Sequence, residues 1–322
     1  MDLYSIKNKT LDSVELKSFE KEKEIQELVE SNTDLLFGVE FISTEFSIYS
    51  QNKNFRIDSL CFDNESNSFV IIEYKKGDSY SVIDQGYSYL STMLNNKDSF
   101  ILEYCRKKNV NVNVEVDWSQ SRIIFVSPSF NSYQKNSVNF KDMNKFELWE
   151  IKRFDNDTIV LNQYQSKSEE SIEKVVGNSD SIINKVNKEI KVYKEEDHTS
   201  KISSELLEKW EEFKDLLNEL GGVEVVPKGP YMSVMYGSKT LCFCIFRSTQ
   251  IQVEMVRGNI KTDGTKSKNF FNIDDPKSIS KPYSWTWKNG TKGNIYKIKL
   301  DNKLDLNYLM FLVKQKYDSL NS

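Results

Sequence analysis

Residues 55–77 read FRIDSLCFDNESNSFVIIEYKKG, two apolar stretches separated by the polar turn DNES. Both stretches are rich in β-branched and aromatic residues, which predicts two neighbouring strands. The second stretch is almost continuously apolar, as expected for a strand inside a sheet. Asp58, Glu73 and Lys75 interrupt this pattern. Because an unpaired charge is costly among so many apolar residues, these three side chains define a candidate site.

The three charged residues belong together by their spacing. Glu73 and Lys75 are two residues apart, so on a strand their side chains project from the same face. Asp58 lies in the middle of the preceding strand. Two carboxylates can hold a hard divalent cation, and a neighbouring lysine can orient a water nucleophile and stabilise developing negative charge. The set fits metal-dependent phosphodiester hydrolysis. The alternative interpretation is an incidental ion pair on a solvated strand face.

Helices are predicted before and after the two strands. Residues 18–31 read as an amphipathic helix with its apolar residues inward. Glu22 is the glutamate nearest the apolar direction, roughly 60° away, and is therefore best placed to approach a neighbouring sheet. On a second helix, at 79–96, Gln85 and Tyr89 are one turn apart and share a face. Glu22 and Gln85 are accordingly candidate members of the site.

The order of the remaining elements predicts two domains. Further strands of the first domain are expected at 41–49, 99–105, 121–127, 147–154 and 157–163. This order predicts an α/β domain at 1–165. Residues 166–200 are rich in Ser, Lys and Glu and are interpreted as a partly helical linker. Residues 201–322 begin and end with helical patterns around several strands, which predicts a small α+β domain.

The composition indicates a cytoplasmic protein with no membrane partner. Of the 322 residues, 38% are hydrophobic and 29% are charged, which is ordinary for a soluble protein. The apolar runs are short, such as FVII at 69–72, and none approaches the roughly 20 residues that cross a membrane. The N-terminal MDLYSIKNKT lacks the apolar region of a signal peptide. Four cysteines without metal-ligand spacing and one histidine argue against zinc sites and histidine-based catalysis.

The overall charge of −4 conceals an asymmetry. Residues 1–165 contain 19 basic and 26 acidic side chains, whereas residues 201–322 contain 19 basic and 14 acidic ones. If a polyanion binds, the second domain is therefore the better place for the electrostatic attraction.

One stretch of the second domain combines aromatic and basic residues. It reads SKPYSWTWKNGTKGNIYK, at 280–297, and its part around Pro282 and Trp285 is expected to be a loop that precedes a strand at 294–300. Trp285 and Trp287 alternate along it, and the nearby lysines include Lys288 and Lys292. Such a set can stack bases and contact phosphates. An equally weighted alternative is that the tryptophans fill the core of a small domain and the lysines are solvated.

The pattern of charged residues resembles a known family. The chain resembles the PD-(D/E)xK nuclease superfamily at Asp58, at the triplet EYK (73–75) and at QGYSY (85–89). It departs from the usual motif at Ile57, where that superfamily usually has proline. The run FRID…IIEYKKG…QGYSYL is especially similar to the branch that contains mismatch- and branched-DNA endonucleases and two-domain "predicted transport proteins". The resemblance covers about residues 18–163.

The resemblance implies a fold and a set of roles. The fold is restriction-endonuclease-like, an α/β domain with a mixed central sheet flanked by helices. Asp58 and Glu73 would be the metal ligands, Lys75 the catalytic lysine and Gln85 a supporting residue. In that branch a glutamate on the first helix joins the site, and Glu22 is its best match here.

The implied activity is that of a Mg²⁺-dependent endonuclease, with Mn²⁺ as a substitute ion, that hydrolyses phosphodiester bonds in DNA. Its role would be defence against foreign DNA or repair. The acidic domain would cut and the basic one would recognise a structure, a sequence or a modified base, in a homodimer if both strands are cut. RNA is an alternative substrate. A second hypothesis, from a different functional class, is a non-catalytic nucleic-acid-binding or regulatory protein that retains a nuclease fold. The intact Asp58, Glu73 and Lys75 argue against this hypothesis.

Overall fold

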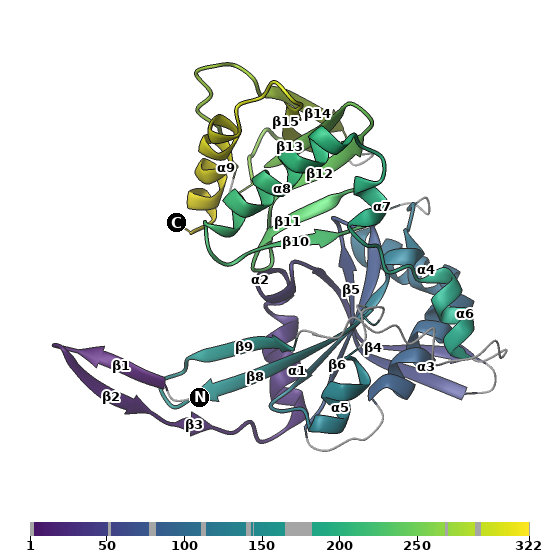
Figure 1. The fold of residues 1–322 in the computed structure, drawn as a ribbon. Coiled ribbons are helices and arrows are strands. Elements are labelled where there is room, and N and C mark those ends of the chain that lie inside the picture. The colour runs from purple at the N-terminus through teal and green to yellow at the C-terminus, as the bar shows by residue number, and fades with distance from the viewer. Residues whose placement is uncertain are drawn as a thin grey trace. The chain divides into compact units, whose positions relative to one another are not determined.

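The computed structural model describes residues 3–50, 53–76, 82–110, 114–139, 143, 145–164, 182–267, 270–286 and 291–321. The chain divides into two compact units, Met1–Val192 and Tyr193–Ser322 (Figure 1). Of the linker expected at 166–200, residues up to 181 lie outside the described part. Its described end is shared between the units, since residues 182–192 belong to the first and residues 193–200 to the second.

A mixed sheet forms the centre of the first unit. The described strands are β1 (Leu3–Lys7), β2 (Thr10–Val14), β3 (Leu16–Lys17), β4 (Glu40–Ser50), β5 (Lys53–Asp63), β6 (Ser68–Tyr74), β7 (Arg122–Ser127), β8 (Phe146–Phe154) and β9 (Ile159–Tyr164). The strand order is β3-β8-β7-β6-β5-β4, with β9 on β8, while β1 and β2 form a separate hairpin that was not predicted. Strands β6, β7 and β8 are parallel, and β4, β5 and β6 are antiparallel.

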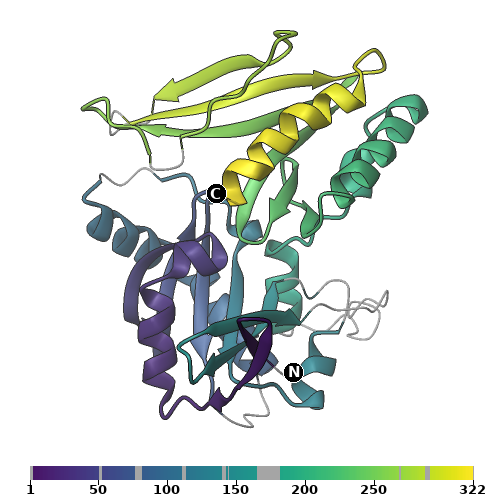
Figure 2. The ribbon, with the colours of Figure 1, turned by 90° about the vertical axis from the view of Figure 1, so that its left-hand side faces the viewer.

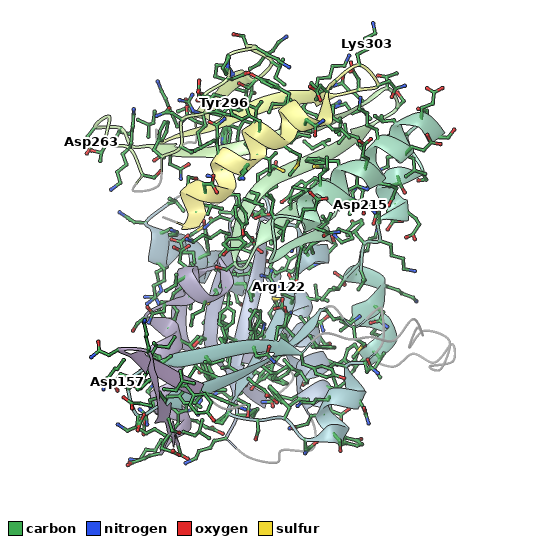
Figure 3. All side chains as sticks on the ribbon, turned by 60° about the vertical axis from the view of Figure 1, so that its left-hand side comes forward. Arg122, Asp157, Asp215, Asp263, Tyr296 and Lys303 are labelled. Atoms are coloured by element: carbon green, nitrogen blue, oxygen red, sulfur yellow. The ribbon has the colours of Figure 1, made fainter. Side chains whose placement is uncertain are left out.

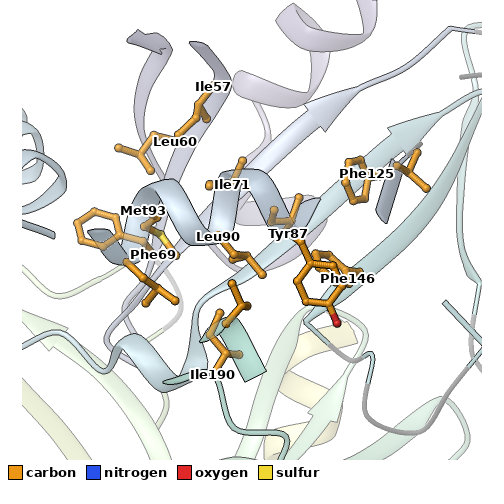
Figure 4. Packing of buried hydrophobic residues seen from close by; sticks show 14 of the residues in the cluster. Ile57, Leu60, Phe69, Ile71, Tyr87, Leu90, Met93, Phe125, Phe146 and Ile190 are labelled. Atoms are coloured by element: carbon orange, nitrogen blue, oxygen red, sulfur yellow. The ribbon is translucent and has the colours of Figure 1, made fainter. Parts of the chain in front are cut away.

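Helices flank this sheet on both faces, which confirms the predicted α/β class with a mixed central sheet. They are α1 (Glu22–Glu30), α2 (Thr33–Phe37), α3 (Val82–Asn95), α4 (Lys97–Lys108), η1 (Trp118–Gln120), α5 (Ser132–Ser137) and α6 (Ile182–Glu189). Ile71 of β6 packs in one cluster with Leu90 of α3 (Figure 4), and its neighbour Ile72 packs in another with Ile25 of α1. Every residue of β6 is buried, because both faces of the strand are covered.

Residues 99–105, predicted as a strand, instead form part of helix α4. Phe100, Ile101 and Tyr104 recur every three to four residues, so on a helix they meet the same core cluster. The last turn of α4 carries three basic residues, which interact favourably with the negative end of the helix dipole. The short apolar run FILEYC was ambiguous between the two structures, and tertiary packing of its helical face decided the outcome.

The second unit is an antiparallel sheet with helices on one face. Its described elements are α7 (Glu196–Thr199), α8 (Ser204–Asn218), β10 (Val223–Pro227), β11 (Met232–Tyr236), β12 (Lys239–Arg247), β13 (Gln250–Ile260), β14 (Lys281–Thr286), β15 (Lys292–Leu300) and α9 (Leu306–Asn321). The strand order is β10-β11-β12-β13-β15-β14. Helices α8 and α9 lie along the sheet (Figure 2) and bury Trp210, Phe213 and Leu309 against it. Strand β14 lies where the sequence predicted a loop.

Buried ion pairs hold the first sheet together at the end away from Glu73. Arg122, labelled in Figure 3, lies with its Nη1 2.8 Å from Asp63 Oδ2 and its Nε 2.8 Å from Glu147 Oε1. The two carboxylates raise the pKa of Arg122 despite its burial. Because Asp63 pairs with Ser68 at the far end of the β5–β6 ladder, this cluster is structural and separate from the candidate site. Across the described helices, none combines the length and apolarity that a membrane crossing requires.

Candidate active site

Strands β5 and β6 bring Asp58 and Glu73 together. The last backbone pair of the β5–β6 ladder on this side is Ser59 with Ile72. The next residues along the two strands are Asp58 and Glu73, which therefore lie opposite each other. There the side chains take over the hydrogen bonds of the ladder. The Asp58 backbone N–H donates to Glu73 Oε1, at 3.1 Å, and the Tyr74 backbone N–H donates to Asp58 Oδ2, also at 3.1 Å. Each carboxylate is therefore fixed by the opposite strand.

Burial and nearby negative charge disfavour the charged forms of both carboxylates. Glu73 is 1% exposed, and its burial, reinforced by the charge of Asp58, raises its pKa to about 8. Burial likewise raises the pKa of Asp58, and the charge of Glu22 adds to this effect. The N–H donors and the positive charge of Lys75 oppose the shift in both cases. When both groups are ionised, the pair would carry more negative charge than its protein partners compensate, and a bound cation would favour that ionised state.

Lys75, Gln85 and Tyr89 surround the Glu73 carboxylate. Lys75 Nζ lies 3.8 Å from Glu73 Oε2, and its side chain is 17% exposed. Gln85 Nε2 donates to the same oxygen at 3.3 Å and lies 3.2 Å from the Tyr89 hydroxyl. The hydroxyl in turn donates to the Arg56 carbonyl at 2.9 Å, which ties α3 to β5. The structure thus brings Lys75 and Gln85, two of the predicted site residues, together with Glu73.

Glu22 approaches the site without joining the two carboxylates. It is the first residue of α1, is exposed, and approaches the sheet where β6 has ended. Its Oε1 accepts a hydrogen bond from the Lys76 backbone N–H at 2.7 Å, just after β6. Its charge is near enough to raise the pKa of Asp58. Glu22 is therefore placed beside the site, where it fixes the chain that follows Lys75.

A buried polar network behind Asp58 was missed from the sequence. Gln26 of α1 donates through Nε2 to the Asp58 carbonyl at 3.2 Å and to Glu30 Oε1 at 2.8 Å. Glu30 Oε1 also accepts from Ser59 Oγ at 2.6 Å, and this hydroxyl lies 3.0 Å from the Tyr74 hydroxyl. The spacing of positions 22, 26 and 30, one helical turn each, was the available signal.

The predicted nucleic-acid-binding residues are only partly described. Trp287 and Lys288 lie outside the described residues. Trp285 lies on edge strand β14, opposite Gly293 of β15, and is half-buried. Lys292 is exposed at the start of β15. Trp285 therefore lies at a sheet edge rather than in the main core cluster of the second unit.

The donor set at Asp58 and Glu73 fits a hard divalent cation. Among the described residues, His, Cys, Asp and Glu side chains do not form a metal-holding group of three or more. A Mg²⁺-like ion does not need one, because it is usually bound by one or two carboxylates and keeps several waters. Asp58 Oδ2 is used by the Tyr74 N–H, and within the described part of the chain no donor reaches Oδ1. Both Glu73 oxygens accept hydrogen bonds, from the Asp58 N–H and from Gln85 Nε2, so such an ion would use the lone pairs that remain on the two carboxylates.

One comparison with known proteins gives a relative. The chain is 40% identical over 321 residues to a protein of Haemophilus influenzae described as uncharacterized. The match covers 98% of this chain and 99% of that protein, so it spans both units. No family model and no solved structure matches the chain.

Proposed function

The chain belongs to the same family as this Haemophilus influenzae protein, and we propose that it is a metal-dependent endonuclease that hydrolyses phosphodiester bonds in DNA. The observation that carries the proposal is the grouping of Asp58 and Glu73 on two central strands with Lys75, which directly follows β6, and with Gln85 against Glu73. Glu73 is buried and Asp58 half-buried, and their raised pKa values show that the hydrogen bonds from the strand N–H groups only partly offset the cost of two ionised carboxylates here. We further assign the first unit a restriction-endonuclease-like fold.

Asp58 and Glu73 would hold a Mg²⁺ ion, or Mn²⁺ in its place. When bound, such an ion polarises the phosphate and lowers the pKa of water. The chain's own residues do the positioning. Glu73 is held between the Asp58 N–H and Gln85, and the Asp58 main chain is held by Gln26. A ligand pair fixed in this way loses little entropy when the substrate phosphate arrives.

Lys75 supplies the positive charge of the proposed mechanism. Its Nζ lies beside the buried Glu73 carboxylate, and its backbone N–H donates to the Val126 carbonyl at 2.9 Å, which continues the pairing of β6 with β7. The ammonium group can therefore reach the reacting phosphate from a fixed main chain. There it orients the attacking water and stabilises the charge that develops on the phosphate oxygens.

The proposed cellular compartment and oligomeric state follow from the cysteines and from the number of candidate sites. All four cysteines are free and buried, which suits the reducing cytoplasm. The role would be defence against foreign DNA or repair. Because each chain offers one candidate site, cutting both strands of a duplex favours a homodimer.

A cleavage assay tests the proposal. Purified protein is incubated with plasmid, single-stranded DNA and RNA, with Mg²⁺, Mn²⁺ or EDTA. We expect DNA cleavage that EDTA abolishes, and for Lys75→Ala a rate lower by at least about 100-fold. Asp84→Asn, an exposed position on α3 next to Gln85, is the matched control and should cut as fast as the wild type.

Two results would overturn the proposal. The first is that the protein cuts no substrate with either ion, which would favour a non-catalytic protein that keeps a nuclease-like fold. The second is that Lys75→Ala cuts as fast as the wild type. Cleavage of RNA alone would keep the site but change the substrate.

A further inference from the structure

The edge of the second sheet exposes aromatic and basic side chains together. In the β14–β15 register Lys281 lies opposite Lys297, Tyr283 opposite Ile295, and Trp285 opposite Gly293, so these side chains share one face of the sheet. The alternate residues of β15, including Ile298 and Leu300, pack in the core cluster with α8 and α9. The face with the aromatic residues, called here the β14 face, is therefore turned away from the helices.

The two rings of the β14 face lie side by side. The ring centroids of Tyr283 and Trp285 are 6.4 Å apart, with 27° between the ring planes. A Cβ atom at Gly293 would come within 2.3 Å of the Trp285 ring, so glycine there lets the indole lie directly on the strand. Tyr283 is 49% exposed, and Lys297 Nζ lies 3.9 Å from the centroid of its ring. The face thus presents two nearly parallel π-surfaces, one of them largely open to solvent.

Positive charge surrounds these rings. Lys281 and Lys297 lie opposite each other on the β14 face, and Lys281 is exposed, whereas Lys292 pairs with Thr286 and projects from the other face. Lys297 is paired with Glu254, at 3.3 Å, so part of its charge is already compensated. Over residues 257–303 the sequence has 11 basic and four acidic side chains. The charge complements a phosphate backbone that runs past both rings.

We propose that the β14 face binds single-stranded DNA, with bases stacked on Tyr283 and Trp285 and phosphates contacted by Lys281, with Lys297 beside it. Unpaired strands are favoured because the faces of the bases are covered by their neighbours in a duplex and can lie on protein rings only when they are free. The choice of DNA rests on the proposed function.

Binding is measured separately from cleavage. Fluorescence anisotropy in EDTA compares a labelled single-stranded DNA oligonucleotide of mixed sequence, its duplex and the equivalent RNA, with the full-length chain. We expect the single-stranded DNA to bind most tightly. Tyr283→Ala should weaken its binding about 5- to 150-fold through the loss of one stacked base, and Tyr283→Phe should retain it. Phe311→Ala, which removes an exposed ring of α9, is the matched control and should bind like the wild type.

Salt dependence tests the phosphate contacts. For a single strand, log K falls as log salt concentration rises, and the loss of one phosphate contact makes this negative slope shallower by about 0.7. We expect this change for Lys281→Ala and not for Lys314→Ala, an exposed lysine of α9. Unchanged binding by Tyr283→Ala, or tighter binding of duplex or RNA, would overturn the proposal. Binding is measured in EDTA, which prevents cleavage, so the two proposals can fail separately. Single-strand binding in a protein without nuclease activity would refute the proposed function and support the β14 face. Nuclease activity in a protein whose β14 face does not bind single strands would support the proposed function and refute this inference.

Discussion

Glu73 is the residue that makes the site unusual. It is buried in the most apolar strand of the first unit, opposite a second carboxylate, and both of its oxygens are positioned by donors. Burial alone would raise the pKa of this carboxyl group, and Asp58 raises it further. Proteins rarely retain such a pair without a compensating charge. In the proposed function, a divalent cation would supply the charge that Lys75 by itself does not.

A stability measurement follows from this charge imbalance. Mg²⁺ that binds only the folded state should stabilise the wild type by about 1.4 to 2.7 kcal/mol when its concentration is 10 to 100 times the dissociation constant. The melting temperature in Mg²⁺ should therefore exceed that in EDTA. Glu73→Gln should lose this difference, while Asp84→Asn should keep it. An equal Mg²⁺ effect in Glu73→Gln would place the ion elsewhere.

At the residue scale the sequence predicted the charged members of the site and missed its polar support. Asp58, Glu73 and Lys75 were recognisable because a charge inside an apolar strand has few explanations. Gln26 and Glu30 were not, because polar residues on an amphipathic helix are usually solvated. Only the fold shows that this edge of α1 faces the main chain of Asp58.

Helix α3 is the element that carries the supporting residues of the site. Its Gly86 follows Gln85 directly and lies over Phe146 of β8, where an added Cβ atom would come within 2.5 Å of the ring. Phe146 is buried and packs against Tyr87, so its ring cannot move away freely. Glycine therefore sets how closely α3 approaches the sheet, and with it the position of Gln85.

Gly86→Ala separates helix propensity from packing. Alanine should favour the isolated helix by about 1 kcal/mol, whereas overpacking against Phe146 should cost about 1 to 3 kcal/mol. We expect a net decrease in the free energy of unfolding, measured by denaturant titration, together with slower cleavage because Gln85 is displaced. Ser88→Ala, also on α3, is the control. Gly237→Ala would not serve, because the φ of Gly237 is 56°, a left-handed backbone value that is strained for alanine. An increase in stability would show that α3 does not lie as close to β8 as described.

Element types were predictable where periodicity was long and clear. Strands β5, β6 and β7 and helices α1 and α3 were expected close to their observed bounds. The run at 99–105 was too short to distinguish a strand from a helix, and β14 was read as a loop because Pro282 and polar residues interrupt its pattern. Its pairing with β15 is a long-range contact that a local pattern does not contain.

At the scale of the whole molecule, two separate cores predict two unfolding transitions. The second unit contains Lys316, which is 5% exposed and lies with its Nζ 5.0 Å from the centroid of the Phe271 ring. Burial, with a contribution from the charge of Lys239, lowers the pKa of Lys316 to about 8. Below pH 8 the folded unit must hold a buried ammonium group, which costs stability. The cost is relieved as the pH rises.

The sign of this pH effect is fixed by the two pKa values. Between about pH 8 and the ordinary lysine value near 10.5, the unfolded chain binds more protons, so stability rises with pH. The gain for one group is at most about 3 kcal/mol. We expect the second transition alone to shift upward over this range, by calorimetry, and Lys316→Met to be more stable than wild type at pH 7 and to lack the shift. A first transition that moves equally would contradict the assignment.

The central claim is that Asp58 and Glu73 hold a divalent cation. Its most direct test is a crystal structure of the protein soaked with Mn²⁺, in which anomalous scattering locates the ion independently of the protein model. We predict a peak between the Asp58 and Glu73 carboxylates, with Lys75 beside it, and no peak there in Glu73→Gln. A fully soaked crystal without a peak at these carboxylates, or with manganese bound only elsewhere, would contradict the account.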